Sequence, residues 1–261
     1  MKIDTMHVLL TGAAGGIGSA IARALAGQGA ALLLVGRTAA PLERLAEDLR
    51  AIGARAEVLA ADVTLATDRD RLAEAAAAFG VNVLVQAAGA PAFGRFEQQG
   101  DALVASVLLT NLVAPMQLAQ RLLPQLRRQS QARVLNIGSA LGRLGLPGYA
   151  IYSASKFGLR GFSEALRREL GDSPVRVQYL GPRSTQTAFN DRRVDAYNRA
   201  TGTRSDAPER VAVAAVRLLQ SGAAERFIGF PEQLAVRLNG LVPALLDSAF
   251  STHGAALRAV N

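Results

Sequence analysis

Tyr152 and Lys156 are the two side chains in this sequence best suited to acid–base chemistry. The chain has only two lysines, Lys2 and Lys156, against twenty-seven arginines, and the internal lysine follows a tyrosine by four positions. Positions four apart on a helix share a face, so the phenol and the ammonium can address one ligand. A nearby cation lowers the pKa of a tyrosine from its ordinary value of about 10. The pair therefore predicts a general acid or base that works near neutral pH.

A glycine-rich turn near the start of the chain is suited to binding phosphate groups. The run Thr11-Gly12-Ala13-Ala14-Gly15-Gly16-Ile17-Gly18 follows the apolar residues 6–10 and opens a helical pattern over 16–27. Glycines let the backbone approach a pyrophosphate, and the helix N-terminus supplies N–H groups and a positive dipole. Because the spacing differs from the standard dinucleotide fingerprint, a purely structural turn is the alternative reading.

Arg37 follows directly on the second apolar run, residues 31–35, after Gly36. An acid at this point binds the adenosine ribose hydroxyls of NAD, whereas an arginine suits the 2′-phosphate of NADP. The sequence therefore predicts NADP as the cofactor. A surface arginine without a ligand is the alternative.

Further polar residues stand where predicted strands end. Asp62 and Val63 close the third strand, Gln86 to Gly89 close the fourth, and Ser139 ends the fifth. Asn111 interrupts an apolar helical run, and a buried asparagine needs hydrogen-bond partners. Open parallel sheets bind ligands at the carboxyl ends of their strands, so these residues are candidate site residues. For each alone, ordinary strand-end or core chemistry remains open.

Short apolar runs alternate with helical patterns along the chain, which predicts a doubly wound parallel α/β sheet, Rossmann-like and in a single domain. We expect strands at 6–10, 31–35, 56–60, 81–86, 133–137, 175–180 and 226–229. Helices are expected at 16–27, 41–52, 68–79, 101–128 with a kink at Pro115, 151–170, and from a cap at Asp206 to Gly222. Residues 182–205 lack periodicity and read as an excursion or lid.

Composition excludes several classes of site. There is no cysteine, and the two histidines, His7 and His253, lie at opposite ends, so a metal site or a histidine triad is not expected. The net charge of +8 comes from scattered arginines without a basic tract, so no nucleic-acid binding is predicted. Solvated surface charge is the expected explanation, and attraction of anionic substrates is the alternative that stays open. No uninterrupted apolar run reaches the length of a membrane span, and no signal peptide is recognisable. We expect a soluble, cytoplasmic protein.

Taken together and in this order, these residues resemble the classical short-chain dehydrogenase/reductase family over residues 6 to about 230. The resemblance implies oxidoreductase activity on a small-molecule carbonyl/alcohol pair, with the catalytic residues Asn111, Ser139, Tyr152 and Lys156. Serine and tyrosine hydroxyls would bind the substrate oxygen, tyrosine would transfer the proton, lysine would hold the nicotinamide ribose, and asparagine would help hold a relay water. The implied cofactor-binding residues are Gly12, Ala14, Gly15, Gly16, Ile17, Gly18, Arg37, Asp62, Val63, Ala88, Gly89, Tyr152, Lys156, Pro182, Thr185 and Thr187.

Two positions depart from the family pattern. Gln86 stands where the family has asparagine, and a local repacking is expected there. Arg183 replaces the glycine of a Pro-Gly pair, so it could point at a substrate or at a partner. A binding sensor or scaffold without turnover is the rival function, although a pure binder has no need of the serine, tyrosine and lysine.

The remaining expectations concern surfaces. The helices 101–128 and 151–170 are apolar on more than one face (Leu108, Leu112, Met116; Phe157, Phe162, Leu166). The family resemblance implies a homo-oligomer that pairs these helices, with sheet-facing core as the alternative. We expect one domain over 1–261, with a substrate lid at about 182–207 and a C-terminal tail at about 231–261. The apolar tail segment 234–246 suggests a flap over a hydrophobic substrate. Subunit packing and peripheral membrane contact are its alternatives.

Overall fold

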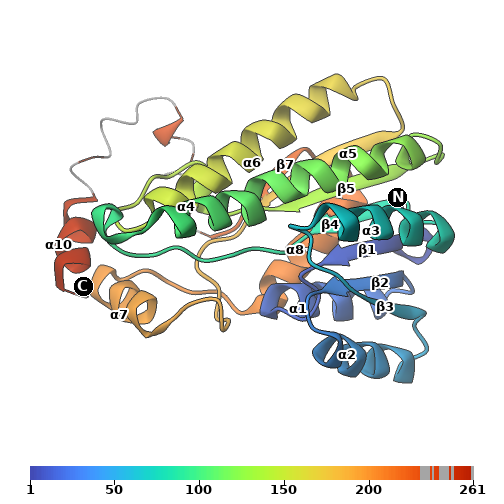
Figure 1. Ribbon diagram of the computed structural model, residues 1–261, viewed down its shortest axis with the longest axis horizontal. Helices are drawn as coiled ribbons and strands as arrows, with labels where there is room; N and C mark the ends of the chain where they lie inside the picture. Colours follow the sequence, from blue (N-terminus) through green and yellow to red (C-terminus); the bar gives the residue numbers. More distant parts are fainter. Residues whose placement is uncertain (230–235, 237, 241–246, 248–249, 260–261) are drawn as a thin grey trace.

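One parallel sheet forms the centre of the molecule (Figure 1). The computed structural model describes residues 1–229, 236, 238–240, 247 and 250–259. Within this part of the chain the strand order is β3-β2-β1-β4-β5-β6-β7, and all neighbours pair in parallel. The predicted doubly wound sheet is confirmed. Its strands are β1 (His7–Thr11), β2 (Ala31–Gly36), β3 (Ala56–Ala60), β4 (Val83–Gln86), β5 (Ala132–Ile137), β6 (Val175–Gly181) and β7 (Glu225–Phe227).

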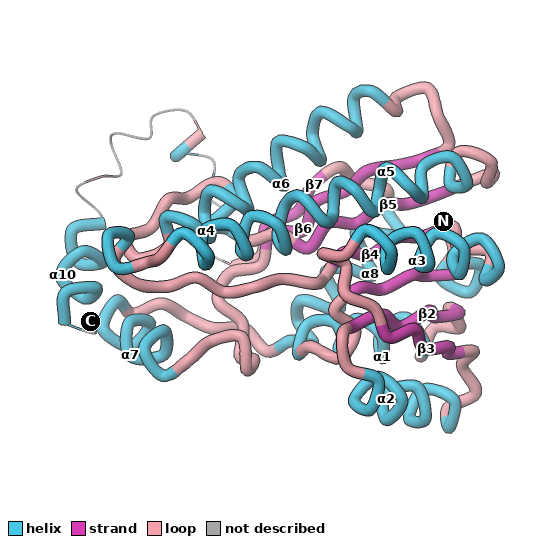
Figure 2. Tube along the Cα trace, in the orientation of Figure 1, coloured by secondary structure: helices cyan, strands magenta, loops and turns pink. Residues whose placement is uncertain are grey.

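Helices cover both faces of the sheet (Figure 2). One face carries α1 (Gly16–Ala26), α2 (Ala39–Ala51) and α8 (Pro208–Ser221); the other carries α3 (Ala66–Phe79), α5 (Ala114–Leu126) and α6 (Ala150–Glu169), with α4 (Asp101–Leu108) beside α6. Short 3-10 turns lie at Ile3–Thr5, Phe96–Gln98 and Ala140–Gly142. Because both faces of the sheet are covered, the central strands β1, β2 and β4 are almost wholly apolar rather than alternating.

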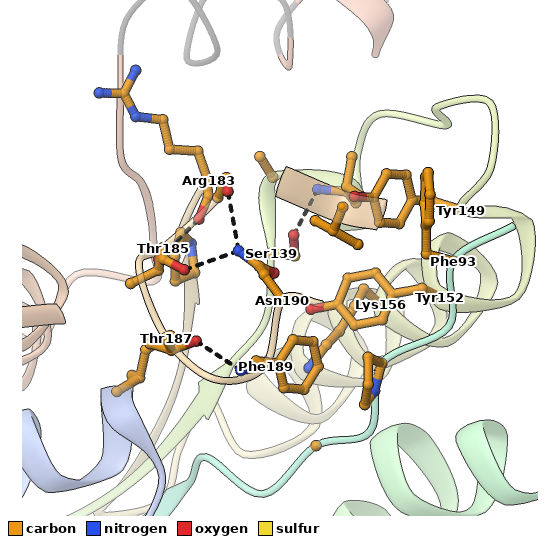
Figure 3. A pocket seen from close by; sticks show the side chains of 18 of the residues that line it. Phe93, Ser139, Tyr149, Tyr152, Lys156, Arg183, Thr185, Thr187, Phe189 and Asn190 are labelled. Carbon is orange, nitrogen blue, oxygen red and sulfur yellow. Dashed lines mark hydrogen bonds between the residues drawn. The ribbon is translucent and has the colours of Figure 1, made fainter. Parts of the chain in front are cut away.

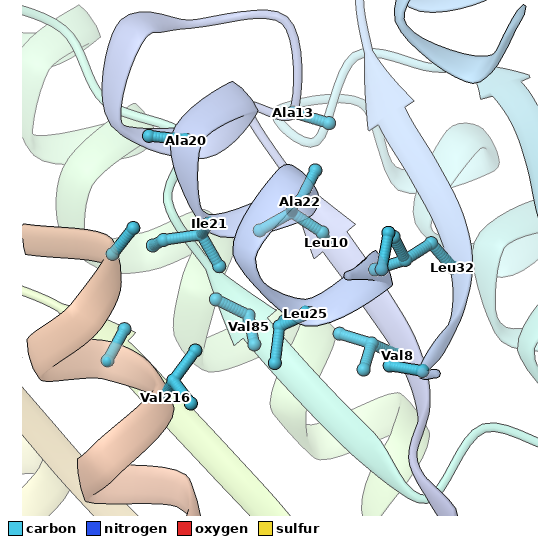
Figure 4. Packing of buried hydrophobic residues seen from close by; sticks show 14 of the residues in the cluster. Val8, Leu10, Ala13, Ala20, Ile21, Ala22, Leu25, Leu32, Val85 and Val216 are labelled. Atoms are coloured by element: carbon cyan, nitrogen blue, oxygen red, sulfur yellow. The ribbon is translucent and has the colours of Figure 1, made fainter. Parts of the chain in front are cut away.

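Successive residues of β1 enter two separate cores. Val8 and Leu10 pack in the cluster that contains Ile21 of α1, whereas Leu9 lies in the opposite cluster with Leu118 of α5. Figure 4 shows the first cluster, in which α1 lies on the sheet and α8 contributes Val216. Each fully buried leucine contributes about 1.5–3 kcal/mol to folding. This packing fixes the start of α1, and hence the glycine-rich turn, against the end of β1.

The helix predicted at 101–128 is interrupted as expected, but the interruption precedes Pro115. Residues Leu109–Val113 form a π-helical turn between α4 and α5, and Pro115 lies in the first turn of α5. Proline is tolerated there because the first N–H groups of a helix have no partner. The π-turn therefore surrounds Asn111 itself, and such turns occur frequently at functional sites.

The stretch Asp101–Leu126 is long and apolar enough to cross a membrane by length and composition alone. One third of its most apolar window is buried, and it packs against α3, α6, β4 and β5. The core helix of a soluble protein meets the same criterion, so length and composition do not by themselves identify a membrane span.

Two local predictions in the lid region were wrong. Residues 192–201, predicted as irregular, form helix α7 (Arg192–Thr201), in which the Asp191 carboxylate accepts from the Val194 N–H at 2.9 Å. Asp206 does not cap α8, since the N-cap residue is Ala207 and it makes no side-chain cap bond. The Asp206 carboxylate is engaged by two guanidinium groups instead.

The C-terminal segment is described only in part. Helix α10 (Ser251–Ala259) packs against α7, and Val236 packs against Ala140 and Leu144. The predicted flap at 234–246 lies outside the described residues, except for 236 and 238–240.

Candidate active site

A cavity of about 490 Å³ opens at the carboxyl ends of the strands. The glycine-rich turn after β1 lines one end, and Ser139, Tyr152 and Lys156 line the other. Chain order reverses between β1 and β4, so the cavity lies at the switch point where open parallel sheets bind ligands.

The glycine-rich turn lies too close to its neighbours to hold larger residues. Gly12 has φ +66°, and a Cβ there would lie 2.7 Å from the Ala88 nitrogen. A Cβ on Gly18 would collide with the Gly12 carbonyl oxygen. The Thr11 hydroxyl accepts from the N–H groups of Ala87 and Ala88 at 3.2 and 3.3 Å, which ties the turn to the end of β4. The open N-terminus of α1 can therefore approach a phosphate.

Ser139, Tyr152 and Lys156 come together from two elements, the end of β5 and the first turns of α6. Figure 3 shows the Tyr152 hydroxyl end between Ser139 and Lys156. The Ser139 hydroxyl lies on the side of the Tyr152 phenol and accepts from the Leu141 N–H at 3.0 Å. The Lys156 ammonium lies 5.6 Å from the Tyr152 ring centroid and donates to the Ile137 carbonyl at 3.1 Å. A hydroxyl pair beside a buried cation can hold a carbonyl oxygen and protonate it.

The ionisation of this pair differs from the sequence-based expectation. Burial raises the pKa of Tyr152 to about 12, although the hydrogen bond to Ser139 acts in the opposite direction. Burial also lowers the pKa of Lys156 to about 8. Desolvation disfavours the charged form of both groups and outweighs the attraction between phenolate and ammonium. At neutral pH, Tyr152 is therefore a proton donor and Lys156 is mostly charged.

Asn111 joins the π-turn to the loop after β4. Its carbonyl oxygen accepts from the Ala90 N–H at 2.7 Å. Its amide donates to the Ala90 carbonyl at 3.0 Å and to the Ser155 hydroxyl at 3.1 Å. The Ser155 hydroxyl in turn donates to the Tyr152 carbonyl at 2.7 Å. The buried asparagine thus has the partners that burial requires and connects the loop to the helix that carries Tyr152.

Tyr179 supports Ser139, a role that the sequence did not reveal. From the end of β6, its fully buried hydroxyl accepts from the Ser139 N–H and donates to the Ser139 carbonyl, both at 3.0 Å. A Cβ on Gly138 or Gly142 would overlap its ring. The sequence does contain a signal for this role. Tyr179 is the one aromatic residue of its strand, and glycines lie on either side of Ser139.

The segment after β6 closes the cavity near the glycine-rich turn. Pro182, Thr185 and Thr187 all line the cavity, and the Thr187 side chain lies against Gly16. The Arg183 side chain turns away from Tyr152 (Figure 3). It forms a buried ion pair with Asp206, with Nε 3.0 Å from Oδ2 and Nη2 2.8 Å from Oδ1. Arg210 also reaches Asp206, at 3.0 Å. The arginine in place of the family glycine lines the cavity and anchors this segment through Asp206.

The remaining predicted residues surround the cavity without lining it. Ala14 lies in the glycine-rich turn, and Ala88 follows β4. Arg37 is exposed at the end of β2, while Asp62 and Val63 follow β3. The Asp62 carboxylate accepts from the N–H and the hydroxyl of Thr64, and Val63 packs against the core. By contrast, Gly15, Gly16, Ile17, Gly18 and Gly89 line the cavity directly.

Gln86 stands at the position where asparagine was expected, and its side chain reaches across the sheet. Its amide donates to the Pro115 carbonyl at 3.1 Å and to the Asn136 side chain at 3.0 Å. The expected local repacking therefore takes the form of a buried polar link between β4, β5 and α5.

Sequence comparison identifies the family to which this arrangement belongs. A family model described as short chain dehydrogenase matches residues 6–198. The chain belongs to the short-chain dehydrogenase/reductase family. Among relatives of this oxidoreductase, nodulation protein G of Rhizobium sp. (strain N33) is 35% identical over 234 residues, which are 87% of this chain and 94% of that protein.

Two solved structures of short-chain dehydrogenases that resemble this chain contain a bound nicotinamide cofactor. A short-chain dehydrogenase from Sphingobium yanoikuyae, in complex with NADPH, has a TM-score of 0.79 at 28% identity, covering 94% of this chain and 96% of that one. A short-chain dehydrogenase/reductase from Burkholderia phymatum, in complex with NAD, has a TM-score of 0.85, covering 94% and 96%; its 24% identity speaks for the fold alone. The first of these neighbours is bound to NADPH and the second to NAD.

Proposed function

We propose that this short-chain dehydrogenase interconverts a carbonyl and an alcohol with NADP(H), using Tyr152 as the proton donor and acceptor. The observation that carries the proposal is the position of the Tyr152 phenol, between the Ser139 hydroxyl and the Lys156 ammonium, in the cavity that the glycine-rich turn lines. A proton donor and a phosphate-binding turn in one cavity serve a reaction that needs both a cofactor and an acid.

The residues around the cavity fit a dinucleotide. The cradle at Gly12 and Gly18 has no room for side chains, and the N-terminus of α1 offers N–H groups to a pyrophosphate. When bound, the nicotinamide supplies or accepts the hydride. The residues that would hold the cofactor are the glycine-rich turn, Arg37, Asp62 and Val63, Ala88 and Gly89, Lys156, and Pro182, Thr185 and Thr187.

The protein's own contribution to reduction is to hold the substrate oxygen and protonate it. The Ser139 hydroxyl donates a hydrogen bond to the carbonyl oxygen, and the Tyr152 O–H transfers its proton to the same atom. Lys156 is close enough to stabilise the phenolate that forms, which the buried site otherwise disfavours. Asn111 acts through Ala90 and Ser155, which fix the loop and helix beside the reacting groups.

Arg37 supports NADP over NAD. It stands exposed directly after β2, and no acid occupies the end of that strand. A guanidinium at this point favours a 2′-phosphate, whereas NAD binding gains from a carboxylate that accepts from the ribose hydroxyls.

A homo-oligomer is favoured by the outer surface of the α4–α5–α6 layer. Leu103, Leu109, Met116 and Phe157 are each exposed by 37–42%. Leu166 is buried in the sheet-facing core, and Phe162 packs against that core, so only part of the predicted apolar face is available. We expect light scattering at micromolar concentration to give at least twice the 27.3 kDa chain mass. A monomeric mass would contradict this.

The proposed activity is tested by following the loss of NADPH absorbance with a panel of uncharged ketones and aldehydes. Thermal shift with NADPH, measured in parallel, reports cofactor binding. We expect both binding and turnover. Binding without turnover on any carbonyl class would favour the sensor, and absence of both would reject the proposal.

A further inference from the structure

The substrate end of the cavity has a continuous aromatic wall formed by Phe93, Tyr149, Tyr152, Phe189 and Tyr197. Phe93 packs against Tyr149 with ring centroids 4.9 Å apart and against Tyr197 at 5.0 Å. Tyr152 links this group to Phe189, at 6.0 Å, and to Tyr149, at 6.3 Å. These rings come from the loop after β4, the start of α6, and the lid, so three segments converge on one surface.

Tyr149 differs from the other phenols of this wall. The Tyr197 hydroxyl contacts the Pro147 carbonyl at 3.0 Å and His253 at 2.8 Å, and the Tyr152 hydroxyl contacts Ser139. The Tyr149 hydroxyl has no hydrogen-bond partner among residues 1–229 and the described parts of the tail. Figure 3 shows it pointing into the cavity. A phenol placed this way can bind a polar atom of the ligand without an internal bond being broken.

Few charged groups lie along the cavity. Among the described residues that line it none is acidic, and the Arg183 guanidinium forms an ion pair with Asp206 that is less than one tenth exposed. Arg193 lies against Phe93, 5.8 Å from the ring centroid, but does not line the cavity. Under the proposed function, the Lys156 ammonium interacts with Tyr152 and with the cofactor. An ionised group brought against this wall would lose its hydration without compensation.

Resting on the proposed function, we infer that the substrate is an uncharged ketone or alcohol on a rigid ring system, and that Tyr149 selects it by hydrogen-bonding a second oxygen on that ring system. A rigid ring meets aromatic faces over a broad area and has little conformational freedom to lose on binding. A linear chain of equal carbon number makes poorer contact with such faces and loses rotamer freedom.

The first test compares 2-decalone, a fused bicyclic ketone, with the linear ketone 2-decanone, both with NADPH. We expect kcat/KM for 2-decalone to be at least tenfold higher. Phe93→Leu should reduce this ratio severalfold, whereas Phe96→Leu, a ring that is 62% exposed and outside the cavity, should leave it unchanged. Equal kcat/KM for the two ketones in the wild type would overturn the ring requirement while leaving the proposed activity intact.

The second test isolates the Tyr149 hydroxyl with Tyr149→Phe, which keeps the ring. Decalin-1,5-dione carries a second oxygen, and 1-decalone lacks it. We expect KM for the dione to rise about three- to tenfold, the range that one neutral hydrogen bond covers, and KM for 1-decalone to stay within twofold. A parallel change for both ketones, or no change for either, would overturn the assignment of Tyr149. Turnover of any of these ketones shows that such a failure belongs to this inference and not to the proposed function.

Discussion

The Tyr179 hydroxyl brackets Ser139 by accepting from its N–H and donating to its carbonyl, with both contacts at 3.0 Å. The hydroxyl is buried at the end of β6 and does not line the cavity, so it acts only through the residue that it holds. The backbone of Ser139 is therefore held in place by a residue of the neighbouring strand β6.

Tyr179→Phe should lower kcat about 10- to 100-fold with little change in KM for the cofactor, because small displacements of a reacting group cost on this scale. The variant should also lose about 1–3 kcal/mol of unfolding free energy, since the Ser139 backbone is left without its buried partner. Steady-state kinetics and urea denaturation check the two effects. An unchanged kcat in a destabilised variant would show that Tyr179 is only structural.

The pH profile of carbonyl reduction should reflect Lys156. Tyr152, with a pKa of about 12, stays protonated across the accessible range and can donate throughout. Lys156, with a pKa of about 8, loses its charge as pH rises through that value. The kcat/KM for reduction should therefore be flat below about pH 7 and fall above about pH 8.

Lys156→Arg provides the control for this profile, because its guanidinium stays charged at all these pH values. Its activity should be 10²–10⁴-fold lower, which is about the size of a lost acid–base contribution. The reason is that the planar, forked guanidinium does not fit the space that the compact Lys156 ammonium occupies. Its residual rate should show no fall near pH 8. If the same fall persisted in the arginine variant, another group would be responsible.

Arg37 should set the choice of cofactor. A charge-assisted contact with the 2′-phosphate contributes about 1.5–3 kcal/mol, or about 10- to 100-fold in affinity. The wild type should prefer NADPH over NADH by at least about tenfold in kcat/KM. Gly36→Asp combined with Arg37→Ile should reverse the order, because the new carboxylate binds the ribose diol and repels the phosphate. An Arg37→Ala variant weakened equally towards both cofactors would count against this role.

The Arg183–Asp206 ion pair should stabilise the segment that closes the cavity. Asp206→Asn removes the buried carboxylate that Arg183 and Arg210 share, and breaking a buried ion pair costs about 3–5 kcal/mol of unfolding free energy. Arg183→Gly combined with Asp206→Asn should cost less than the sum of the two single substitutions, because each single substitution breaks the same pair. Urea denaturation of the three variants measures the difference, and additive losses would contradict this coupling.

Most of the fold could be predicted from the sequence because its central strands β1, β2 and β4 are almost wholly apolar and its turns carry glycines. Helix α7 was missed because most of its residues are polar and only three of them, Val194, Tyr197 and Asn198, are buried. The role of Asp206 was misread because an aspartate just before a helix looks the same in the sequence whether it caps that helix or forms an ion pair with a distant arginine. Sequence spacing brought out Ser139, Tyr152 and Lys156, whereas Tyr179 and the aromatic wall depend on contacts between distant segments.

The most direct test of the account is the rate of NADPH-dependent ketone reduction by Tyr152→Phe, measured together with its affinity for NADPH. The substitution removes the proton donor and leaves the ring between Tyr149 and Phe189. The account predicts a rate at least 10²–10⁴-fold below wild type with NADPH affinity nearly unchanged. A phenylalanine variant that reduces the same ketone at close to the wild-type rate would contradict the assignment of Tyr152 as the acid.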